Sequence, residues 1–555
     1  MSSESVSGAK SAKKIVVSLE YLSKLFIMPD SVDRFIEFGQ ELLNLIHSFF
    51  QEKGGIHSAI SIHELAELFS DPNIPESPDL LKNVLFEIKE KLVAHSVKVG
   101  NPYYVGHMTS AIPYFMILLE MIIAALNQNQ VKIESAKAST FLEREFVIWM
   151  HRLVYKQSDD YYKESFFDRE IAVGTVTSGG TLANLTALLV ARNKLFKPEG
   201  DFKGIRKSGL VEAYRHYNTD KAVVIVSERG HYSIDKAARI LGVGEDNVIK
   251  IPVDKEDRMD VALLENKLNE INEHNKKNQT KIKVIAVIAI AGNTETGNID
   301  PIGKIAELTS KHNIYLHVDA AWGGSLLICD NYREMYAGIE NADSVSLDAH
   351  KLMYSPVSVA VCVFKNKDDL SNIKHAANYI IRPDSMDLGR FTIEGSRPFA
   401  CLKPWATLKI IGKKGFELLF EHSFLLTKEL TRIIDEHPNF ERTNSPELFI
   451  TNYRFIPQTV KEKLYKLKQE NNISDLKKIN DLLNELNIEL HKALREEDNS
   501  FVSRTTLNCC NLNTVILRAV TINPLTTKEI LAEIIEQQNR LGMSIFISFF
   551  LERIP

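Results

Sequence analysis

A lysine and an aspartate follow two neighbouring apolar runs of this sequence. Lys351 comes after His350 and the run at residues 343–347, and Asp319 ends the run at residues 315–318. Short apolar runs with polar ends are typical of buried strands, so both charged side chains would lie where a strand meets a loop. A lysine amine can bind an aldehyde covalently, and a carboxylate can keep a pyridine nitrogen protonated. The pair therefore predicts a site for pyridoxal phosphate (PLP) and chemistry at the α-carbon of an amino acid.

A glycine-rich turn, Ser178-Gly179-Gly180-Thr181, lies between the apolar run 172–177 and an Ala/Leu-rich stretch at residues 182–193. Glycines let the backbone approach a phosphate, a helix N-terminus offers unpaired N–H groups, and Thr181 can add a hydroxyl. Taken alone, the same residues are more typical of a tight strand-to-helix turn with a capping threonine. As part of a PLP site, they predict the phosphate position.

His231 follows a further apolar run, residues 222–227, and could stack on a planar cofactor ring. Each of these residues also has a plain structural interpretation: His231 as a loop histidine, Asp319 as half of a salt bridge, and Lys351 as a solvated lysine. The four signals occur in one order, each at the end of a predicted strand. Together they favour a cofactor site over four unrelated structural roles.

The elements that position these residues alternate between strand and helix from about residue 101 to 364. Near-continuous apolar strands between amphipathic helices predict an α/β fold with a mostly parallel sheet covered on both faces. Ligands of such sheets bind at the carboxyl ends of the strands. The predicted strands are 172–177, 222–227, 284–290, 315–318, 343–347 and 359–364, and the predicted helices are 182–193, 233–241, 261–271 and 301–312.

The flanking regions follow different patterns. Apolar residues at helical spacing predict helices in the first hundred residues, after a loose tail at residues 1–14. Beyond residue 365 we expect a smaller α+β region, with helices at 408–435, 476–490 and 528–541 and strands at 514–521 and 544–550. The predicted domains are thus 1–100 (helical segment), 101–375 (large PLP-binding domain) and 376–555 (small domain, with the active-site loop region).

Composition narrows the class of protein. The 555 residues carry a net charge of −5, and basic residues are interspersed with acidic ones, which argues against a nucleic-acid partner. Five cysteines without metal-ligand spacing predict reduced thiols, a cytoplasmic location and no metal site. The tail lacks a signal-peptide core, and the apolar stretch 114–126 contains Glu120 and is too short for a bilayer span. We therefore expect no membrane partner.

The chain resembles the group II PLP-dependent amino-acid decarboxylases over residues 100 to 550. The resemblance lies in the segments 101–104, 177–181, 317–324 and 350–351, together with His231. It implies a PLP-dependent type I fold and a homodimer with active sites at the interface. Segments 101–113 and 126–129 most resemble a bacterial aspartate 1-decarboxylase branch that is similar to glutamate decarboxylases. That implies α-decarboxylation of L-aspartate to β-alanine and CO2.

The resemblance also implies roles for individual residues. Lys351 matches the lysine that binds the cofactor, Asp319 the partner of the pyridine nitrogen, and His231 the histidine stacked on the ring. The other implied cofactor contacts are Gly179, Gly180, Thr181, Thr294 and His350, and the implied substrate contacts are His107, Met108, Thr109 and Arg518. Arg518 matches an arginine that binds the substrate carboxylate, a role that suits the two-pronged guanidinium.

Two stretches depart from the family pattern. Asp348-Ala349 precedes the His-Lys pair where many relatives have Asn-Pro. Relatives also carry a loop tyrosine that protonates the reaction intermediate, whereas residues 384–391 contain none and Tyr379 aligns poorly with that position. The proton would then come from another group, from water or from a loop of the partner subunit.

Four functions compete at this stage. The first is decarboxylation of an acidic amino acid, with aspartate ahead of glutamate. An aromatic amino-acid decarboxylase would leave Arg518 without a partner. A lyase for a phosphorylated sphingoid base shares the core but usually has a membrane-anchoring helix. A PLP-binding scaffold without turnover is disfavoured because every cofactor position is present.

Overall fold

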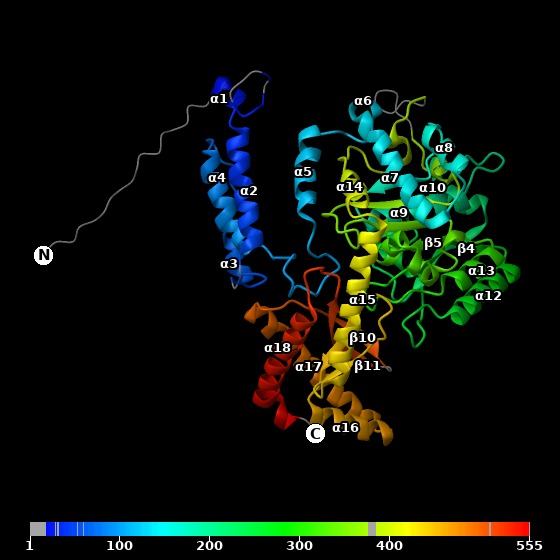
Figure 1. Ribbon diagram of the computed structural model, residues 1–555. Helices are drawn as coiled ribbons and strands as arrows, with labels where there is room; N and C mark the ends of the chain where they lie inside the picture. The colour runs from blue at the N-terminus through cyan, green and yellow to red at the C-terminus, as the bar shows by residue number, and fades with distance from the viewer. Residues whose placement is uncertain are drawn as a thin grey trace. The chain divides into compact units, whose positions relative to one another are not determined.

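The computed structural model describes residues 18–27, 29, 33–52, 54–58, 60–375, 384–509 and 512–553. The chain forms two compact units (Figure 1): one comprises the described residues up to Gly100 with Arg495–Ser500, and the other comprises Asn101–Leu494 with the residues from Phe501 onward. Tyr379 lies outside the described residues. The predicted boundary near residue 375, within the second unit, stays a prediction.

The second unit is built around a seven-stranded sheet with the order β1-β7-β6-β5-β4-β2-β3. Only β7 runs antiparallel to its neighbours, so the predicted α/β fold with a mostly parallel sheet is confirmed. The strands are β1 (Gly174–Thr177), β2 (Thr219–Ser227), β3 (Val248–Ile251), β4 (Lys281–Ile290), β5 (Leu316–Asp319), β6 (Ser344–Asp348) and β7 (Ala360–Phe364).

Helices cover both faces of this sheet, which explains its near-continuous apolar strands. Alternate residues of β2 enter two different cores: Val223 and Ile225 join one, and Val224 and Val226 the other. The first core includes residues of α7 (Ala138–Tyr155), α12 (Val261–Lys277) and α13 (Ile302–Lys311). The second includes α9 (Gly180–Leu195), α10 (Ile205–His216) and α11 (Ser233–Ile240).

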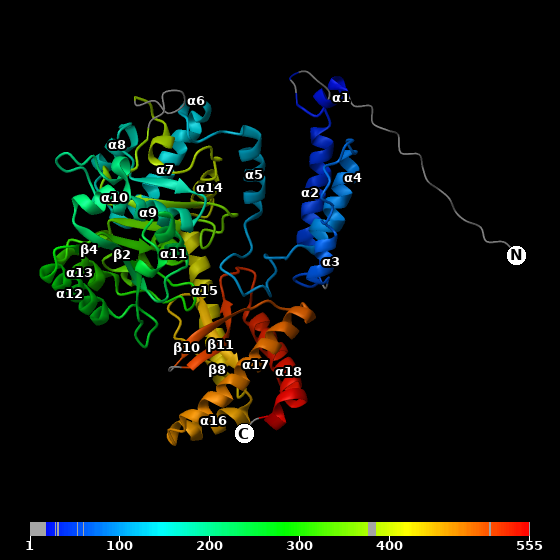
Figure 2. The same ribbon diagram turned by 180° about the vertical axis from the view of Figure 1, so that it is seen from behind.

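A smaller antiparallel sheet has the order β10-β11-β9-β8. Its strands are β8 (Phe440–Arg442), β9 (Ile450–Phe455), β10 (Ser503–Cys509) and β11 (Leu512–Val520), and its helices are α15 (Gly412–Glu436), α16 (Gln458–Gln469), α17 (Ile473–Glu497) and α18 (Lys528–Ile545). Figure 2 shows α15 reaching from the large sheet to the small one, and it contacts residues beside both. The two sheets are therefore joined by a shared helix.

The strand predicted at residues 544–550 is wrong, because α18 continues to Ile545 and residues Phe546–Phe550 form a π-helical turn. Phe546 and Phe550, four residues apart, are buried on one side, while Ile547 and Phe549 are exposed. A short apolar run has no period of its own that separates strand from helix, so burial against neighbouring elements decided its structure.

The N-terminal unit is helical, as predicted. Its helices are α1 (Leu19–Ser23), α2 (Phe35–Gln51), α3 (Ile62–Glu67) and α4 (Leu81–Glu87), the last of which continues as a π-helix over Ile88–Leu92. None of these helices contains a buried residue. Across the part of the chain that the structure describes, no helix has the length and apolar character needed to cross a membrane. The same part holds no cluster of three metal-binding side chains.

Candidate active site

A cavity of about 310 Å³ lies at the carboxyl ends of the parallel strands. Turns after β1, β2, β4, β5 and β6 each contribute to its wall. All eight predicted cofactor contacts line it, namely Gly179, Gly180, Thr181, His231, Thr294, Asp319, His350 and Lys351. The structure thus brings together residues from five separate stretches of the chain.

Lys351 is held against the residue that departs from the family pattern. Its Nζ lies 3.0 Å from Oδ2 of Asp348, a side chain that is only 3% exposed. His350 Nε2 lies 3.6 Å from the same oxygen, and His350 Nδ1 lies 3.0 Å from the carbonyl oxygen of Val359. Oδ1 of Asp348 has no hydrogen-bond partner among the described residues. The cavity wall therefore keeps one buried acceptor available.

The first residue of α9, Gly180, has little room for a side chain. A Cβ on Gly180 would lie 2.9 and 3.0 Å from the two carboxylate oxygens of Asp348 and 3.1 Å from Cβ of Ala321. α9 begins at this residue, so the N-terminus of a helix lies at the cavity. Helix N-terminal N–H groups attract anions, and the missing side chain leaves room for one to approach.

Asp319 ends β5, between β4 and β6, and is 8% exposed. Oδ2 of Asp319 accepts a hydrogen bond from Nδ2 of Asn184 at 2.8 Å. Oδ1 accepts one from the hydroxyl of Ser346 and one from the backbone N–H of Ala321, both at 3.2 Å. The carboxylate at the cavity wall is therefore fixed by three donors, and they stabilise its negative charge.

His231 is oriented by its own loop, because its Nδ1 accepts the backbone N–H of Ser233 at 3.2 Å. Desolvation lowers the pKa of His231, with Asp319 acting in the opposite direction and Lys351 in the same one. A neutral ring that accepts at Nδ1 carries its proton on Nε2. His231 therefore presents an uncharged imidazole to the cavity.

Arg518 lies on β11 and is 7% exposed. Its Nη1 donates to the carbonyl oxygen of Gly106 at 3.3 Å and to Oγ of Ser503 at 3.1 Å, whereas Nε is buried without a partner among the described residues. Burial lowers the pKa of Arg518 to about 10, and the charge of Glu295 opposes this shift. No hydrogen-bonded carboxylate compensates this guanidinium in the described part of the chain.

Two of the predicted substrate contacts, His107 and Met108, differ in their exposure to solvent. His107 is exposed, with Nδ1 3.0 Å from Oγ1 of Thr109, and desolvation followed by the charges of Arg518, Lys351 and His350 lowers its pKa. These groups therefore share one electrostatic environment. Met108 is instead 5% exposed and packs in the core of the large sheet. The cavity wall described above includes none of the four predicted substrate contacts, whose roles stay predictions.

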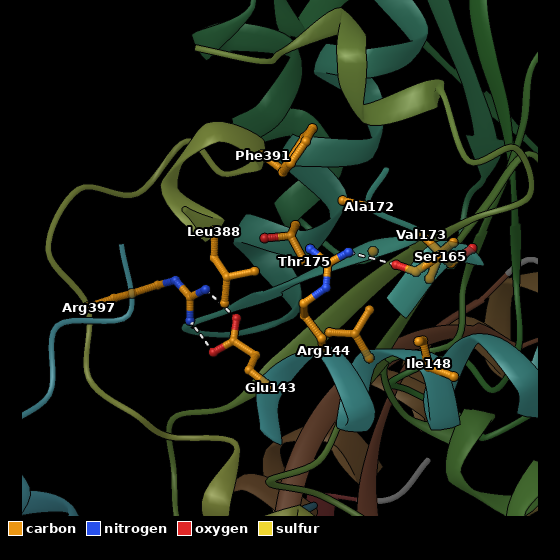
Figure 3. A pocket seen from close by; sticks show the side chains of 12 residues that line it. Glu143, Arg144, Ile148, Ser165, Ala172, Val173, Thr175, Leu388, Phe391 and Arg397 are labelled. Atoms are coloured by element: carbon orange, nitrogen blue, oxygen red, sulfur yellow. Dashed lines mark hydrogen bonds and ion pairs between the residues drawn. The ribbon is translucent and has the colours of Figure 1, made fainter. Parts of the chain in front are cut away.

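A second, much narrower pocket of about 30 Å³ lies beside the loop stretch that lacks the family tyrosine. Figure 3 shows Arg397 facing Glu143 there, with Leu388 and Phe391 above them. Nη1 of Arg397 donates to Oε2 of Glu143 at 2.8 Å, and Nη2 bonds the other carboxylate oxygen. Arg144 donates to four backbone carbonyl oxygens. These charges hold the fold together and offer no reactive group.

The sequence reasoning missed several residues of the larger cavity. Asn184, Arg229, Trp322 and Ser358 also line it. Asn184 had a usable signal, because it is a polar residue within the first turns of an otherwise Ala/Leu-rich helix. Arg229 is compensated by Asp257 at 2.8 Å and Glu295 at 3.1 Å, a pairing that no local pattern reveals.

The fold is that of type I PLP-dependent enzymes, and the match to a protein family defines the class. The pyridoxal-dependent decarboxylase conserved domain matches residues 63–455, and the chain belongs to this family. It is 39% identical over 534 residues to the aspartate 1-decarboxylase of Aliivibrio fischeri, covering 96% of each chain. It is 27% identical over 380 residues to an L-2,4-diaminobutyrate decarboxylase of Acinetobacter baumannii, covering 66% of this chain and 70% of that one.

Two solved structures share the fold. The glutamate decarboxylase domain of a diaminobutyrate-pyruvate transaminase and L-2,4-diaminobutyrate decarboxylase from Vibrio parahaemolyticus aligns with a TM-score of 0.75 at 22% identity, covering 95% of this chain and 99% of that one. Mouse CSAD aligns with a TM-score of 0.77 at 22% identity, covering 91% and 99%. The protein is a PLP-dependent amino-acid decarboxylase, and its cofactor is PLP.

Proposed function

We propose that this enzyme removes the α-carboxylate of L-aspartate, releasing CO2 and β-alanine. The observation that carries the proposal is Arg518, a buried guanidinium bonded only to a carbonyl and a hydroxyl, with its Nε unpartnered in the described part of the chain. The similarity to an aspartate 1-decarboxylase over nearly the whole chain supports the same substrate.

A substrate side-chain carboxylate would complete the environment of Arg518. Guanidinium and carboxylate pair by two parallel hydrogen bonds, and burial strengthens the pairing. An aromatic side chain would leave the buried charge unpaired, which costs more than a missing methylene in an apolar pocket. The site therefore favours acidic substrates.

The residues of the cavity fit PLP. At the start of α9 the Gly180 position leaves little room for a side chain, so a ligand can approach the helix N–H groups, and Oδ1 of Asp348 is a buried acceptor without a partner in the described part of the chain. When bound, PLP supplies the electron sink for the pair of electrons left on the α-carbon. We propose Lys351 as the covalent anchor, Asp319 as the ring-nitrogen partner and His231 as the ring-stacking residue. Gly179, Gly180 and Thr181 would hold the phosphate, with Thr294 and His350 as further contacts.

Several of these residues are oriented by contacts within the protein. Asp348 holds the amine of Lys351 at the cavity wall, and three donors fix the carboxylate of Asp319. The neutral ring of His231 can lie against another ring without the cost of burying a second cation. Catalysis benefits because little reorganisation remains once the substrate enters.

We also propose a cytoplasmic homodimer with active sites at the subunit interface. No residue of α1–α4 is buried, and apolar side chains such as Phe35, Ile62 and Phe69 remain exposed. An apolar surface of this extent favours association with another surface. Cys329, Cys362 and Cys401 are free thiols, as a reducing compartment would keep them. A sedimentation measurement giving a monomer would contradict the dimer.

Product analysis tests the substrate assignment. The PLP-loaded protein is incubated separately with L-aspartate, L-glutamate, L-tyrosine and cysteine sulfinate, and the amines are identified by mass. We expect β-alanine from aspartate at the highest kcat/KM. γ-Aminobutyrate as the sole product, or an aromatic amine at comparable kcat/KM, would overturn the proposal.

A further inference from the structure

A line of buried polar side chains leads away from Asp319 into the protein. Asn184 on α9 bonds Asp319, and Oδ1 of Asn184 lies 3.0 Å from Nε2 of His317. Nδ1 of His317 lies 2.9 Å from the hydroxyl of Ser344. His317 and Ser344 are completely buried and Asn184 is 1% exposed. Of these four residues, Asp319 and Asn184 line the cavity.

The directions of the hydrogen bonds of Asn184 follow from counting its donors. The two N–H groups of the Asn184 amide are used by Asp319 at 2.8 Å and by the hydroxyl of Ser233 at 3.0 Å. Its oxygen must then accept, so Nε2 of His317 carries a proton. Rotating the amide by half a turn would place its oxygen against the Asp319 carboxylate, which repels it.

The other side of His317 contacts Ser344. Nδ1 of His317 lies 2.9 Å from the hydroxyl of Ser344 and 3.2 Å from the carbonyl oxygen of Ser344. Burial lowers the pKa of His317 well below its usual value, so the ring is neutral near pH 7. The ring is therefore held by polar contacts on both sides, and its Nε2 proton aligns the Asn184 amide.

Counting acceptors on Asp319 shows what this alignment achieves. Oδ1 already accepts two hydrogen bonds, from Ser346 and Ala321, whereas Oδ2 accepts one, from Asn184. Each carboxylate oxygen has about two acceptor positions, so among the described residues the remaining one is on Oδ2. We infer that Asn184, aligned by His317, is a positioning residue that directs the free acceptor position of Asp319 Oδ2 to the ring nitrogen of PLP. The inference rests on the proposed role of Asp319.

Three variants test this. Asn184→Leu keeps the branched shape but has no amide; His317→Leu removes the Nε2 donor; His317→Gln restores an N–H at nearly the same place. For each full-length protein we would measure the PLP dissociation constant and the visible absorbance of the bound cofactor against pH. The titratable groups around Asp319 are His317 and His231, with Lys351 and Asp348 beside His231.

A hydrogen bond to a charged group is strong enough that losing it should weaken PLP binding about tenfold or more. Asn184→Leu and His317→Leu should show this loss and a shifted absorbance titration, and His317→Gln should recover both. Ser233→Ala is the matched control: it removes the other acceptor of the Asn184 amide, leaves the bond to Asp319, and should keep both properties near wild type. If Asn184→Leu unfolds, the comparison of His317→Leu with His317→Gln still decides; if His317→Leu unfolds, the comparison of Asn184→Leu with Ser233→Ala decides.

Asp319→Asn distinguishes the positioning role of Asn184 and His317 from the proposed role of Asp319. If Asp319→Asn shifts the absorbance titration while both Leu variants, folded and loaded, match wild type, the positioning role is wrong and the proposed role of Asp319 survives. If Asp319→Asn itself leaves PLP binding and absorbance unchanged, the proposed role of Asp319 fails. Equal loss in His317→Leu and His317→Gln would also contradict the inference, because shape rather than the N–H would then matter.

Discussion

Two buried arginines of this enzyme illustrate how the same side chain serves different purposes. Arg397 pairs with Glu143 through both terminal nitrogens (Figure 3), and the charge and hydrogen bonds of Glu143 outweigh burial and raise its pKa. Among the described residues, Arg518 bonds only a carbonyl and a hydroxyl, and burial lowers the pKa of Arg518 to about 10. Both leave Nε unpartnered in the described part of the chain, so the difference is the carboxylate. An internal carboxylate makes a structural pair at Arg397, whereas at Arg518 we propose that the carboxylate of the substrate takes that place.

The largest expected effect comes from removing the carboxylate of the structural pair. Glu143→Gln leaves the buried Arg397 charge uncompensated and should lower the free energy of unfolding by about 3–5 kcal/mol. Denaturant unfolding followed by circular dichroism measures this. Arg397→Ala should be similarly damaging, since it strands Glu143. A loss below about 1 kcal/mol would mean that solvent compensates this pair as it does a surface one.

Removing Arg518 should reduce activity without reducing stability. Arg518→Leu removes a buried uncompensated charge, so stability should hold or rise, while kcat/KM for aspartate should fall about a hundredfold or more because the substrate carboxylate loses its partner. Arg518→Lys keeps the charge without the fork and should retain more activity. Steady-state kinetics beside unfolding curves measure both properties. A fully active Arg518→Leu enzyme would contradict the proposed binding of the substrate carboxylate by Arg518.

A dicarboxylate that cannot react should act on one arginine only. At ten times its dissociation constant, succinate should stabilise the wild-type enzyme by about 1.4 kcal/mol. The same addition should leave Arg518→Leu unchanged, since its carboxylate site is gone. Thermal unfolding with and without succinate measures the difference. Equal stabilisation of both proteins would place the anion elsewhere.

The smallest expected effect is on the pH dependence of stability, and it comes from His151. This buried base stays neutral, unlike the two arginines. Its Nε2 lies 3.0 Å from the carbonyl oxygen of Phe364, and burial lowers its pKa to about 4. The unfolded chain binds a proton at this histidine near pH 6.5, whereas the folded one does not. Stability contributed by neutral His151 is therefore present above pH 6.5 and lost as the pH falls towards 4.

Between pH 7 and pH 5.5 this loss amounts to about 1 kcal/mol. His151→Gln cannot be protonated, so its unfolding free energy should change less than that of wild type over this window. Denaturant unfolding at both pH values measures the difference. An identical pH dependence in the two proteins would show that His151 is not the titrating group.

Much of the site could be predicted because local patterns encode it. Strand ends are visible in the sequence, and parallel strands place their carboxyl ends at one edge, so Gly180, His231, Asp319 and Lys351 could be expected together. Arg518 was predicted by resemblance alone, because a strand arginine has no local signal for burial. The pairs Arg397–Glu143 and Arg229–Glu295 join residues far apart in the sequence and depend on tertiary packing. The strand predicted at residues 544–550 was wrong for the same reason.

The central claim is that the enzyme removes the α-carboxylate of aspartate while Arg518 holds the side-chain carboxylate. The most direct measurement uses L-aspartate isotopically labelled at the α-carboxylate, with CO2 and the amine product collected together. The account predicts labelled CO2 and an equal amount of unlabelled β-alanine. Labelled alanine with unlabelled CO2, the result of losing the side-chain carboxylate, would contradict it.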